Sequence, residues 1–527
     1  MMRARHGKTL VTCVVGVTLS CLFSFGAVAQ ENPELPVLSA KNSQSIAKEI
    51  EPALQQFVDQ QERLPTQAKQ VLVKVTPDIQ AGIVWIDLDS GYLPRGISEF
   101  TEGFGEKVRE VENEGYELIE GVVKFRYIRV RIGGKNLNEI YPPEHLKKKR
   151  ASVDAAAVPV EGLVVLNPGH GKYLNHEDET WRYQRPTLYV GTTDIYEDVV
   201  TPGYSSMLAS LLTERSANTA TSIKHTRDIG NTNVDPESGL AWAALGARYY
   251  LKRLYPALGA TIWNKFPNGS PDRKQPDRAN LREYDDDIRA RPEYANYINA
   301  DTLISLHTDA STNTSARGAT VIANVDDSAS NQLGQNILCY VTEQIRQLPA
   351  YSTYPIRPGV RDGASYGEVR VAAMPTALIE VGFHTNADDS IALRNSVFRA
   401  AAMRGVEKGY RTFKAGETTC LPFKIASIPT ASGKFRVRFP VPVTLQGHPR
   451  FPVTVVTVPV SCPSTWTCGS KTNSFTKAVD NVVTPTYYCD APSTKPAASF
   501  KWKTTVKDAD GVVTAAVEHM TSCSAGT

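Results

Sequence analysis

The chain has 527 residues, more than one hydrophobic core usually organises, so we expect two or three domains. Its 58 lysine and arginine residues nearly balance its 55 aspartate and glutamate residues. This balance gives no electrostatic argument for a nucleic-acid partner or for binding to an anionic membrane surface, and the sequence predicts neither.

Residues 1–29 have the pattern of a secretory signal peptide. Three basic residues precede an apolar run from Leu10 to Phe25, and Ala27-Val28-Ala29 supplies a small-residue cleavage site. Those three residues account for the whole excess of basic over acidic side chains. No later stretch is apolar over a spanning length, so we expect no membrane span. The sequence therefore predicts export to the periplasm or the extracellular space.

Residues 30–155 are expected to form a small N-terminal α+β region. A helical pattern from Ile46 to Gln60 precedes an alternating strand at Val71–Val75 and a second strand from Val122 to Ile132. Charged residues on both faces of the second strand favour a position at the edge of a sheet. The Ala-, Val- and Pro-rich composition of residues 151–159 is typical of a linker.

Strands and helices alternate from about residue 160 to residue 416. This order predicts an α/β fold, a twisted and mostly parallel sheet with helices on both faces. A terminal helix is expected over Ile391–Phe413, and residues 229–280 form an insertion with a helical aromatic stretch from Leu240 to Trp263. The expected strands are Leu163–Leu166, Ser222–His225, Thr302–Ser305, Ala319–Val325 and Thr376–Val381.

Two histidines stand at the ends of apolar strands. His170 follows the first strand in the stretch Pro-Gly-His-Gly, and His307 ends the strand that begins at Thr302. Open α/β sheets place their sites at such strand ends, where two histidines can converge on a metal. Glu197, just before the next helix, is the candidate carboxylate. Two histidines and one carboxylate, with a fourth position for water, are typical of catalytic zinc sites.

Glu380 interrupts a strand that is otherwise apolar. A buried carboxylate without a partner is costly, and beside a zinc site its role would be that of a general base. A structural alternative is an ion pair with Arg361 or Arg370. Structural alternatives also exist for two other candidates: His307 could be a hydrogen-bonded core histidine, and Glu197 a solvated charge near a helix start.

These motifs resemble the zinc-dependent N-acetylmuramoyl-L-alanine amidases, the type 3 amidases of bacterial cell-wall turnover, over about residues 162–413. Pro168 to Gly171 match the family signature, and Leu378 to Phe383 match its closing Leu-x-Glu-x-Gly-Phe motif. The resemblance implies that Zn²⁺ is the cofactor and that peptidoglycan or muropeptides are cleaved between N-acetylmuramic acid and L-alanine. The residues it assigns are His170, Glu197 and His307 as zinc ligands and Glu380 as the catalytic residue.

The chain departs from the family pattern in three places. Asn167 stands where the family usually has aspartate, which would weaken the orientation of His170. The Gly/Asp/Ala-rich stretch after the signature is replaced by a polar one, so the alignment of Glu197 is the least direct. The regulatory helix of some relatives is not evident between Val325 and Pro375. Protein regulators are possible partners, but the sequence does not identify one.

Two other functions fit parts of the sequence. His176, Glu179 and His307 resemble the ligand layout of the zinc carboxypeptidases, but that assignment leaves the Pro-Gly-His-Gly stretch unexplained. The second alternative is an exported wall-binding protein that keeps the amidase fold without turnover, since a fold alone does not establish activity. His225 and His384 have no assigned role, although His384 is close enough to Glu380 in sequence to face the same cleft.

Residues 417–527 are predicted to form a small, disulfide-bonded all-β domain. Runs of β-branched residues broken by proline are typical of a sandwich. Six cysteines follow the signal segment, an even number that favours disulfides in an exported chain. We expect Cys339 to pair with Cys420, which follows the terminal helix. The other four cysteines would cross-link the C-terminal domain in one of three arrangements.

Overall fold

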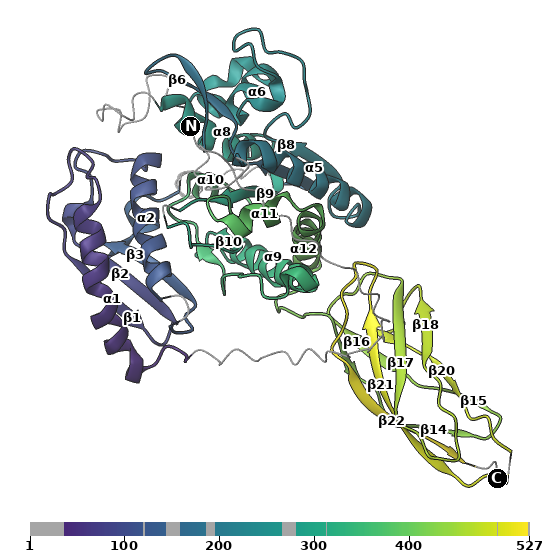
Figure 1. The fold of residues 1–527 in the computed structure, drawn as a ribbon. Helices are drawn as coiled ribbons and strands as arrows, with labels where there is room; N and C mark the ends of the chain where they lie inside the picture. Colours follow the sequence, from purple (N-terminus) through teal and green to yellow (C-terminus); the bar gives the residue numbers. More distant parts are fainter. Residues whose placement is uncertain are drawn as a thin grey trace, which may run out of the picture.

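The computed structural model describes residues 36–119, 122–143, 159–185, 195–265, 281–311, 313–492 and 494–524. The expected signal peptide and most of the expected linker lie outside the described residues. We call residues 36–143 the N-terminal region, 159–416 the central region and 417–524 the C-terminal region (Figure 1). The predicted domain boundaries stay predictions. Within the described residues no helix is long and apolar enough to cross a membrane.

In the N-terminal region, two long helices pack on a four-stranded sheet of order β1-β2-β3-β4. Leu54 of the first helix and Val108 of the second are fully buried against Ile86 of the sheet, so the amphipathic faces of both helices close the core. The elements are α1 (Ala40–Gln60), β1 (Val73–Asp78), β2 (Ile83–Leu88), η1 (Ser90–Tyr92), α2 (Glu102–Ile119), β3 (Tyr127–Ile132), β4 (Lys135–Asn136) and α3 (Leu137–Ile140).

The predicted edge position of the second N-terminal strand is wrong. β3 lies between β2, to which it runs parallel, and the short β4. Its charges have partners instead of solvent: Arg129 is buried and its guanidinium bonds to Asp362 at 2.7 Å and to Asp326 at 2.8 Å. Both partners belong to the central region, so the charge pattern marks a contact between regions.

The central region confirms the predicted α/β fold class. Its six-stranded sheet has the order β11-β10-β12-β9-β5-β8, in which β10 runs antiparallel to β12 and the other neighbours are parallel. The strands are β5 (Val160–Pro168), β8 (Ser222–His225), β9 (Ala300–Asp309), β10 (Thr320–Ala323), β11 (Arg361–Asp362) and β12 (Thr376–Phe383), and a separate hairpin consists of β6 (Lys172–Asn175) and β7 (Thr180–Tyr183).

Helices cover both faces of this sheet. On β5, Val164 and Leu166 share a core with α5, α9 and α12, whereas Leu163 and Val165 share a core with α6, η4 and α8. The predicted insertion therefore supplies part of the helical layer that covers the second face of the sheet. The elements are α5 (Glu197–Arg215), η2 (Trp242–Ala244), α6 (Ala247–Leu254), η3 (Pro256–Leu258), η4 (Gly259–Trp263), α8 (Arg282–Tyr297), α9 (Ser328–Arg346), η5 (Pro349–Tyr351), α10 (Gly367–Val371), α11 (Ala387–Arg394) and α12 (Ser396–Lys414).

Two predicted helices are interrupted. The expected terminal helix is divided into α11 and α12 at Asn395, whose side chain caps α12 by accepting from the backbone amides of Val397 and Phe398. The aromatic stretch from Leu240 to Trp263 is divided into four short helices, because the chain is extended at the Gly246 cap and Pro256 starts a new turn.

The C-terminal region is all-β, as predicted. A three-stranded sheet and a five-stranded sheet share one core, in which Leu445 of the first meets Val455 of the second. The strands are β13 (Lys424–Ser427), β14 (Ala431–Lys434), β15 (Arg438–Pro440), β16 (Val443–Gln446), β17 (Val453–Ser461), β18 (Lys471–Phe475), β19 (Val482–Val483), β20 (Thr486–Tyr488), β21 (Ala498–Lys507) and β22 (Val517–Ser524).

Three disulfides are present among the described residues. Cys339 on α9 is bonded to Cys420, which confirms that predicted pair. The remaining four cysteines pair within the C-terminal region, as Cys462–Cys468 and Cys489–Cys523. The structure thus selects one of the three arrangements that the sequence left open.

Candidate active site

His170 lies in a tight turn directly after β5. The strand ends at Pro168, and the amide of Gly169 donates to the carbonyl of Leu306 on β9 at 2.9 Å. His170 has a left-handed backbone with a φ of 61°, which side chains other than glycine rarely adopt. A Cβ at Gly169 would lie 2.4 Å from Cε1 of His307, so only glycine fits there. The Pro-Gly-His-Gly stretch therefore brings the two imidazole rings together, with centroids 4.9 Å apart.

His307 and Glu380 lie on neighbouring strands at the same level of the sheet. In the parallel ladder between β9 and β12 these two residues are register partners. Residues in register on parallel strands point to the same face of a sheet, so both side chains reach the same cavity. Their exposed fractions are 3% and 7%.

Glu197 is the first residue of α5 and is buried, so it is not a solvated charge. Its Oε1 accepts from the backbone amide of Thr308 at 3.0 Å and lies 2.8 Å from Nδ1 of His307. Its Oε2 lies 3.5 Å from Nε2 of His170. Ligand atoms of His170, Glu197 and His307 all lie within 4.8 Å of one another, and these three form the group that the described residues offer to a metal ion.

Gln184 fixes the tautomer of His170. Its Nε2 donates to Asp287 at 2.8 Å, and its Oε1 accepts from Arg291 at 3.0 Å, so the amide oxygen is turned toward His170. Nδ1 of His170 lies 2.6 Å from that oxygen and is therefore the donor. Burial is the main cause that lowers the pKa of His170 well below its usual value. The neutral ring presents the lone pair of Nε2 to Glu197.

Glu368 orients His307 in the same way. Its Oε2 lies 3.1 Å from Nε2 of His307 and accepts from Nδ2 of Asn167 at 2.6 Å, while Arg291 donates to its other oxygen. Burial opposes ionisation, but Arg291 and His307 lower the pKa of Glu368 to about 2. The ionised carboxylate accepts a hydrogen bond from Nε2 of His307, and Nδ1 of the same ring faces Glu197. Carboxylates in this position commonly fix metal-binding histidines.

The carboxylates Glu197 and Glu368 make the immediate surroundings of His307 negative. Burial alone would lower the pKa of His307, but Glu368 and Glu197 raise it to about 10. Burial and the charge of Asp309 raise the pKa of Glu380 well above its usual value. Together these shifts indicate a place where positive charge is favoured.

Glu380 forms none of the ion pairs considered from the sequence. Arg361 donates to Asn113 and Arg370 donates to the carbonyl of Tyr141, so both arginines bond to the N-terminal region. Among the described residues Oε2 of Glu380 has no hydrogen-bond partner. One oxygen of this buried carboxylate is thus available to a ligand.

A cavity of about 510 Å³ opens over these four side chains. One wall comes from the central region and includes Arg185, Tyr284 and His384, whose Nδ1 lies 2.9 Å from Oγ1 of Thr308. The other wall is the helix α2 of the N-terminal region. The α2 residues that line the cavity are Glu102, Glu106, Arg109, Glu110 and Asn113.

The residues of the carboxypeptidase alternative lie elsewhere. His176 and Glu179 belong to the hairpin of β6 and β7, where His176 accepts from Arg282 at 2.9 Å and lies 3.4 Å from Glu283. Glu179 is exposed at the turn. Neither is among the described residues that line the cavity with His307.

Comparison with known proteins points to one family. Residues 257–411 match the family model described as N-acetylmuramoyl-L-alanine amidase. This match lies within the central region. The matched segment contains His307 and Glu380, whereas His170 and Glu197 precede it. No curated protein matches the chain.

Solved amidase structures resemble the central part of the chain. The N-acetylmuramoyl-L-alanine amidase AmiC2 of Nostoc punctiforme is 18% identical, with 48% of this chain and 97% of that chain covered and a TM-score of 0.30. The amidase from Clostridium difficile 630 is 17% identical, with 49% and 98% covered and a TM-score of 0.31. The catalytic domain of CwlV from Bacillus (Paenibacillus) polymyxa var. colistinus is 14% identical, with 48% and 99% covered and a TM-score of 0.29.

Two polar residues of the candidate active site were not identified from the sequence, Gln184 and Glu368. Asn167, which was expected to affect the orientation of His170, donates hydrogen bonds to Glu368 and Ser305. The charges of α8 could have indicated Gln184 and Glu368. The sequence of α8 looks like that of a solvated helix, but its Asp287 and Arg291 are fully buried. Buried charges of this kind require partners, and their partners are Gln184 and Glu368.

The described residues of the insertion do not reach the cavity. None of residues 229–265 is among the lining residues. Leu251 and Ile262 are buried against the sheet instead, and Tyr249 donates to Glu283 of α8 at 2.5 Å. The described part of the insertion therefore supports the sheet and α8.

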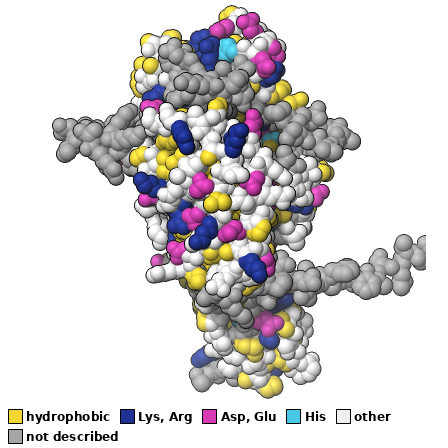
Figure 2. Space-filling view, turned by 90° about the vertical axis from the view of Figure 1, so that its left-hand side faces the viewer, with side chains coloured by type: hydrophobic (Ala, Val, Ile, Leu, Met, Phe, Trp, Pro, Cys, Tyr) yellow, Lys and Arg dark blue, Asp and Glu magenta, His cyan; other side chains and the backbone are white. Residues whose placement is uncertain are grey.

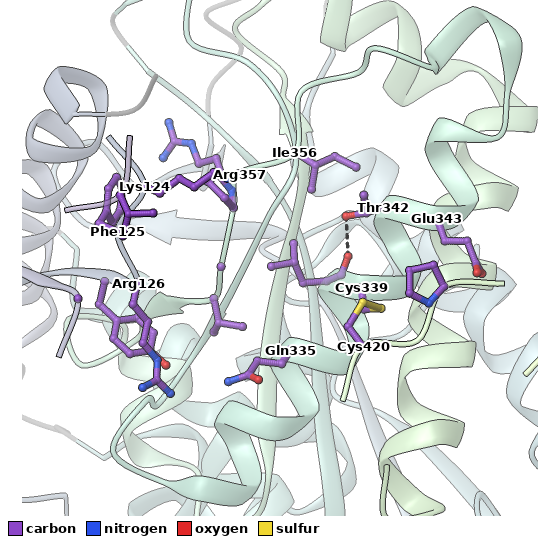
Figure 3. Close-up of a pocket in the computed structure, with 18 of the residues that line it drawn as sticks. Lys124, Phe125, Arg126, Gln335, Cys339, Thr342, Glu343, Ile356, Arg357 and Cys420 are labelled. Atoms are coloured by element: carbon purple, nitrogen blue, oxygen red, sulfur yellow. Dashed lines mark hydrogen bonds between the residues drawn. A yellow bond between two sulfur atoms is a disulfide. The ribbon is translucent and has the colours of Figure 1, made fainter. Parts of the chain in front are cut away.

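A larger cavity of about 1140 Å³ lies elsewhere in the molecule. In Figure 3, Lys124 to Arg126 of the N-terminal region lie on one side of it, and Gln335 and the Cys339–Cys420 disulfide lie on the other. No histidine is among its described lining residues, and its two cysteines are bonded to each other. The larger of these two cavities is therefore not the one that contains the candidate catalytic residues.

Proposed function

We propose that the chain is a zinc-dependent hydrolase that cleaves the amide bond between N-acetylmuramic acid and L-alanine in peptidoglycan. His170, Glu197 and His307 would hold the zinc ion, and Glu380 would transfer the proton. The match to the amidase family model supports the choice of bond, and the arrangement of these four side chains supports their roles.

The observation that carries the proposal is the meeting of electron-pair donors at one point. Nε2 of His170 lacks a proton and faces Oε2 of Glu197 at 3.5 Å, while Nδ1 of His307 lies 2.8 Å from Oε1. Donors that face one another repel unless a proton or a cation lies among them. Two histidines and one carboxylate fit zinc in a catalytic site, where a fourth position stays open.

The chain's own residues suit hydrolysis of an amide. When bound, zinc would polarise the lactyl carbonyl and lower the pKa of a water molecule. Glu380 has a free carboxylate oxygen, which would accept the proton of the attacking water. The same carboxyl group would then give this proton to the L-alanine nitrogen as the C–N bond breaks. The products are a lactyl carboxylate and a free amine.

Product chemistry tests this function. We expect mass spectrometry of digested muropeptides to show stem peptides with a free L-alanine amino terminus and an otherwise unchanged sequence. Loss of single residues from the carboxyl end, with the muramic acid bond intact, would favour the carboxypeptidase. Binding to cell walls without any product, in zinc-loaded protein, would favour the inactive wall-binding protein.

We also propose that the protein is exported and acts on peptidoglycan or its fragments in the periplasm or outside the cell. The disulfides support this location, because they form and persist in oxidising compartments. Cell fractionation of the tagged full-length chain tests it. Recovery of reduced, uncleaved protein in the cytoplasm would contradict it.

A further inference from the structure

We propose that helix α2 of the N-terminal region forms a subsite of the active-site cavity in which Arg109 binds a carboxylate of the substrate's peptide. The subsite rests on the proposed function, because its ligand is the stem peptide that hydrolysis would release. It assigns part of substrate recognition to the N-terminal region.

Helix α2 is held rigidly against the central region. Glu112 accepts from Oγ of Ser365 at 2.8 Å, and both groups are buried. A Cβ at Gly105 would lie 2.6 Å from the carbonyl oxygen of Ser365, so the helix backbone packs directly on the segment before α10. The ion pair of Arg129 with Asp362 at 2.7 Å fixes the same contact from β3. A wall held by these contacts can position a ligand.

Two of the three glutamates of this wall, Glu106 and Glu110, have partners among the described residues. Glu110 accepts from Nε2 of Gln61 at 2.7 Å and lies 3.6 Å from Nζ of Lys107. Glu106 accepts from the hydroxyl of Tyr284 at 3.4 Å across the cavity. Their charges are therefore partly satisfied within the protein and oppose an anionic ligand less than free carboxylates would.

Arg109 is in a different situation. Its guanidinium lies over the ring of Tyr366, 4.5 Å from the centroid, and it lines the cavity. Within the described residues no carboxylate forms an ion pair with it. Tyr366 directly precedes the short helix that carries Glu368, the partner of His307. The stacked guanidinium is thus preorganised close to the candidate zinc ligands, with its hydrogen-bond donors available.

A second arginine lines the same cavity from the central region. Arg185 donates to the hydroxyl of Tyr284, and it forms no ion pair with a carboxylate in the part of the chain that the structure describes. Two guanidinium groups without a carboxylate partner in one enclosed space favour a ligand with a carboxylate, which guanidinium binds with two parallel hydrogen bonds.

The substrate offers such a group close to the bond that is cleaved. In bacterial stem peptides the residue after L-alanine is a glutamate linked through its side chain, which leaves its α-carboxylate free. That carboxylate lies one residue from the scissile amide. A cavity of about 510 Å³ is within the usual range for sites that enclose a ligand of this size.

The test compares two soluble muropeptides, one with the free α-carboxylate and one with that group amidated. For Arg109→Ala we expect KM on the free acid to rise about tenfold or more, because a charged hydrogen-bonded pair is lost, with kcat and zinc content unchanged. On the amidated substrate the variant and the wild type should have KM values within about twofold of each other. Arg109→Lys should fall between them.

Arg126→Ala is the matched control. Arg126 is also an N-terminal arginine stacked on a tyrosine, 5.0 Å from the ring of Tyr127, but it lines the larger cavity instead. This variant should keep the wild-type KM on both substrates. An unchanged KM for Arg109→Ala, or an equal rise on both substrates, would overturn the subsite. Wild-type protein that cleaves neither substrate at the muramic acid bond would instead refute the proposed function.

Discussion

In the proposed mechanism, Glu380 would couple metal binding to proton transfer. Burial and Asp309 raise the pKa of its carboxyl group well above the usual value and so disfavour its ionised form. A cation held between His170, Glu197 and His307 would supply the missing positive charge and favour the ionised form. Under this proposal the residue would act as a base more readily in the zinc-loaded site than in the empty one.

Replacement of this carboxylate separates chemistry from metal binding. Glu380→Gln keeps the size of the side chain but removes the proton acceptor, so we expect kcat to fall by a factor of about 10² or more. Zinc content, measured by atomic absorption, should stay at the wild-type level because Glu380 is not one of the proposed ligands. Retained turnover in this variant would remove Glu380 from the mechanism.

The carboxylate ligand is tested by a pair of variants. Glu197→Ala should lose zinc and activity together, because Glu197 contributes both oxygens to the histidine cluster. The double variant His176→Ala with Glu179→Ala should keep its zinc, since these side chains lie on the β6–β7 hairpin outside the cavity. Equilibrium dialysis against a zinc buffer measures both. The reverse result would restore the carboxypeptidase assignment.

The sequence predicts the candidate site residues far better than the residues that support them. His170, His307 and Glu380 each stand at or within an apolar strand, where a polar residue needs a special reason. Gln184 carries no such signal, because it directly follows the short hairpin strand β7 and its role depends on a partner 103 residues away. Contacts between residues far apart in the sequence leave no periodic pattern in it.

At the scale of elements, the contact between helix α2 and the central region should have a stability that depends on pH. Burial, followed by the charge of Asp362, raises the pKa of Glu112 from 4.5 to about 7. A carboxyl group whose pKa is higher in the folded state stabilises the fold below pH 4.5, and this contribution is lost as pH rises to about 7. The packing of α2 on Ser365 should therefore weaken over that range.

Glu112→Gln should remove this pH dependence, because glutamine can still accept from Ser365 and does not ionise. Between pH 4.5 and pH 8 we expect the wild type to lose about 3 kcal/mol more stability than the variant. Thermal unfolding midpoints across this pH range measure the difference, with the exposed Glu99→Gln as the control. Parallel pH profiles for wild type and Glu112→Gln would contradict the assignment.

Whole elements were predicted well where their own pattern determines them and poorly where tertiary contacts decide. The apolar strands of the central sheet were identified because both of their faces are covered. The charged strand β3 was assigned to an edge, since a sequence does not show that Arg129 meets Asp326 and Asp362 of another region. The insertion was predicted to lie beside the central sheet, but its Leu251 helps to cover one face of that sheet.

For the whole molecule, the central region is the part that the other two contact. The N-terminal region contributes a wall of the cavity through α2, and the C-terminal region is attached through α9 and α5. Figure 2 shows basic and acidic side chains interspersed on one face of the molecule, in agreement with the near balance of charge. The N-terminal and C-terminal regions are thus attached to the central region by a few specific contacts and not by a charged surface.

The Cys339–Cys420 disulfide is the covalent part of that attachment. It closes a loop with a sequence separation of 81 residues. In the chain-entropy treatment a loop of this size contributes about 4 kcal/mol to stability. Without the bond, the C-terminal region would keep the ion pairs Arg215–Asp510 at 2.9 Å and Arg450–Glu214 at 2.5 Å. The Arg450–Glu214 pair is partly exposed and contributes little, so the covalent bond is the main constraint lost and the junction near Lys414 should open more often.

We therefore expect the double variant Cys339→Ser with Cys420→Ser to be cut by trypsin at Lys414 or Lys424 at least about tenfold faster than the wild type, because opening governs cleavage. Its C-terminal region should stay folded, since it keeps two disulfides of its own. The matched control is Cys462→Ser with Cys468→Ser, which opens a loop of only 6 residues within that region. This control should leave the junction resistant. Equal cleavage rates at the junction in all three proteins would show that noncovalent contacts alone hold the C-terminal region in place.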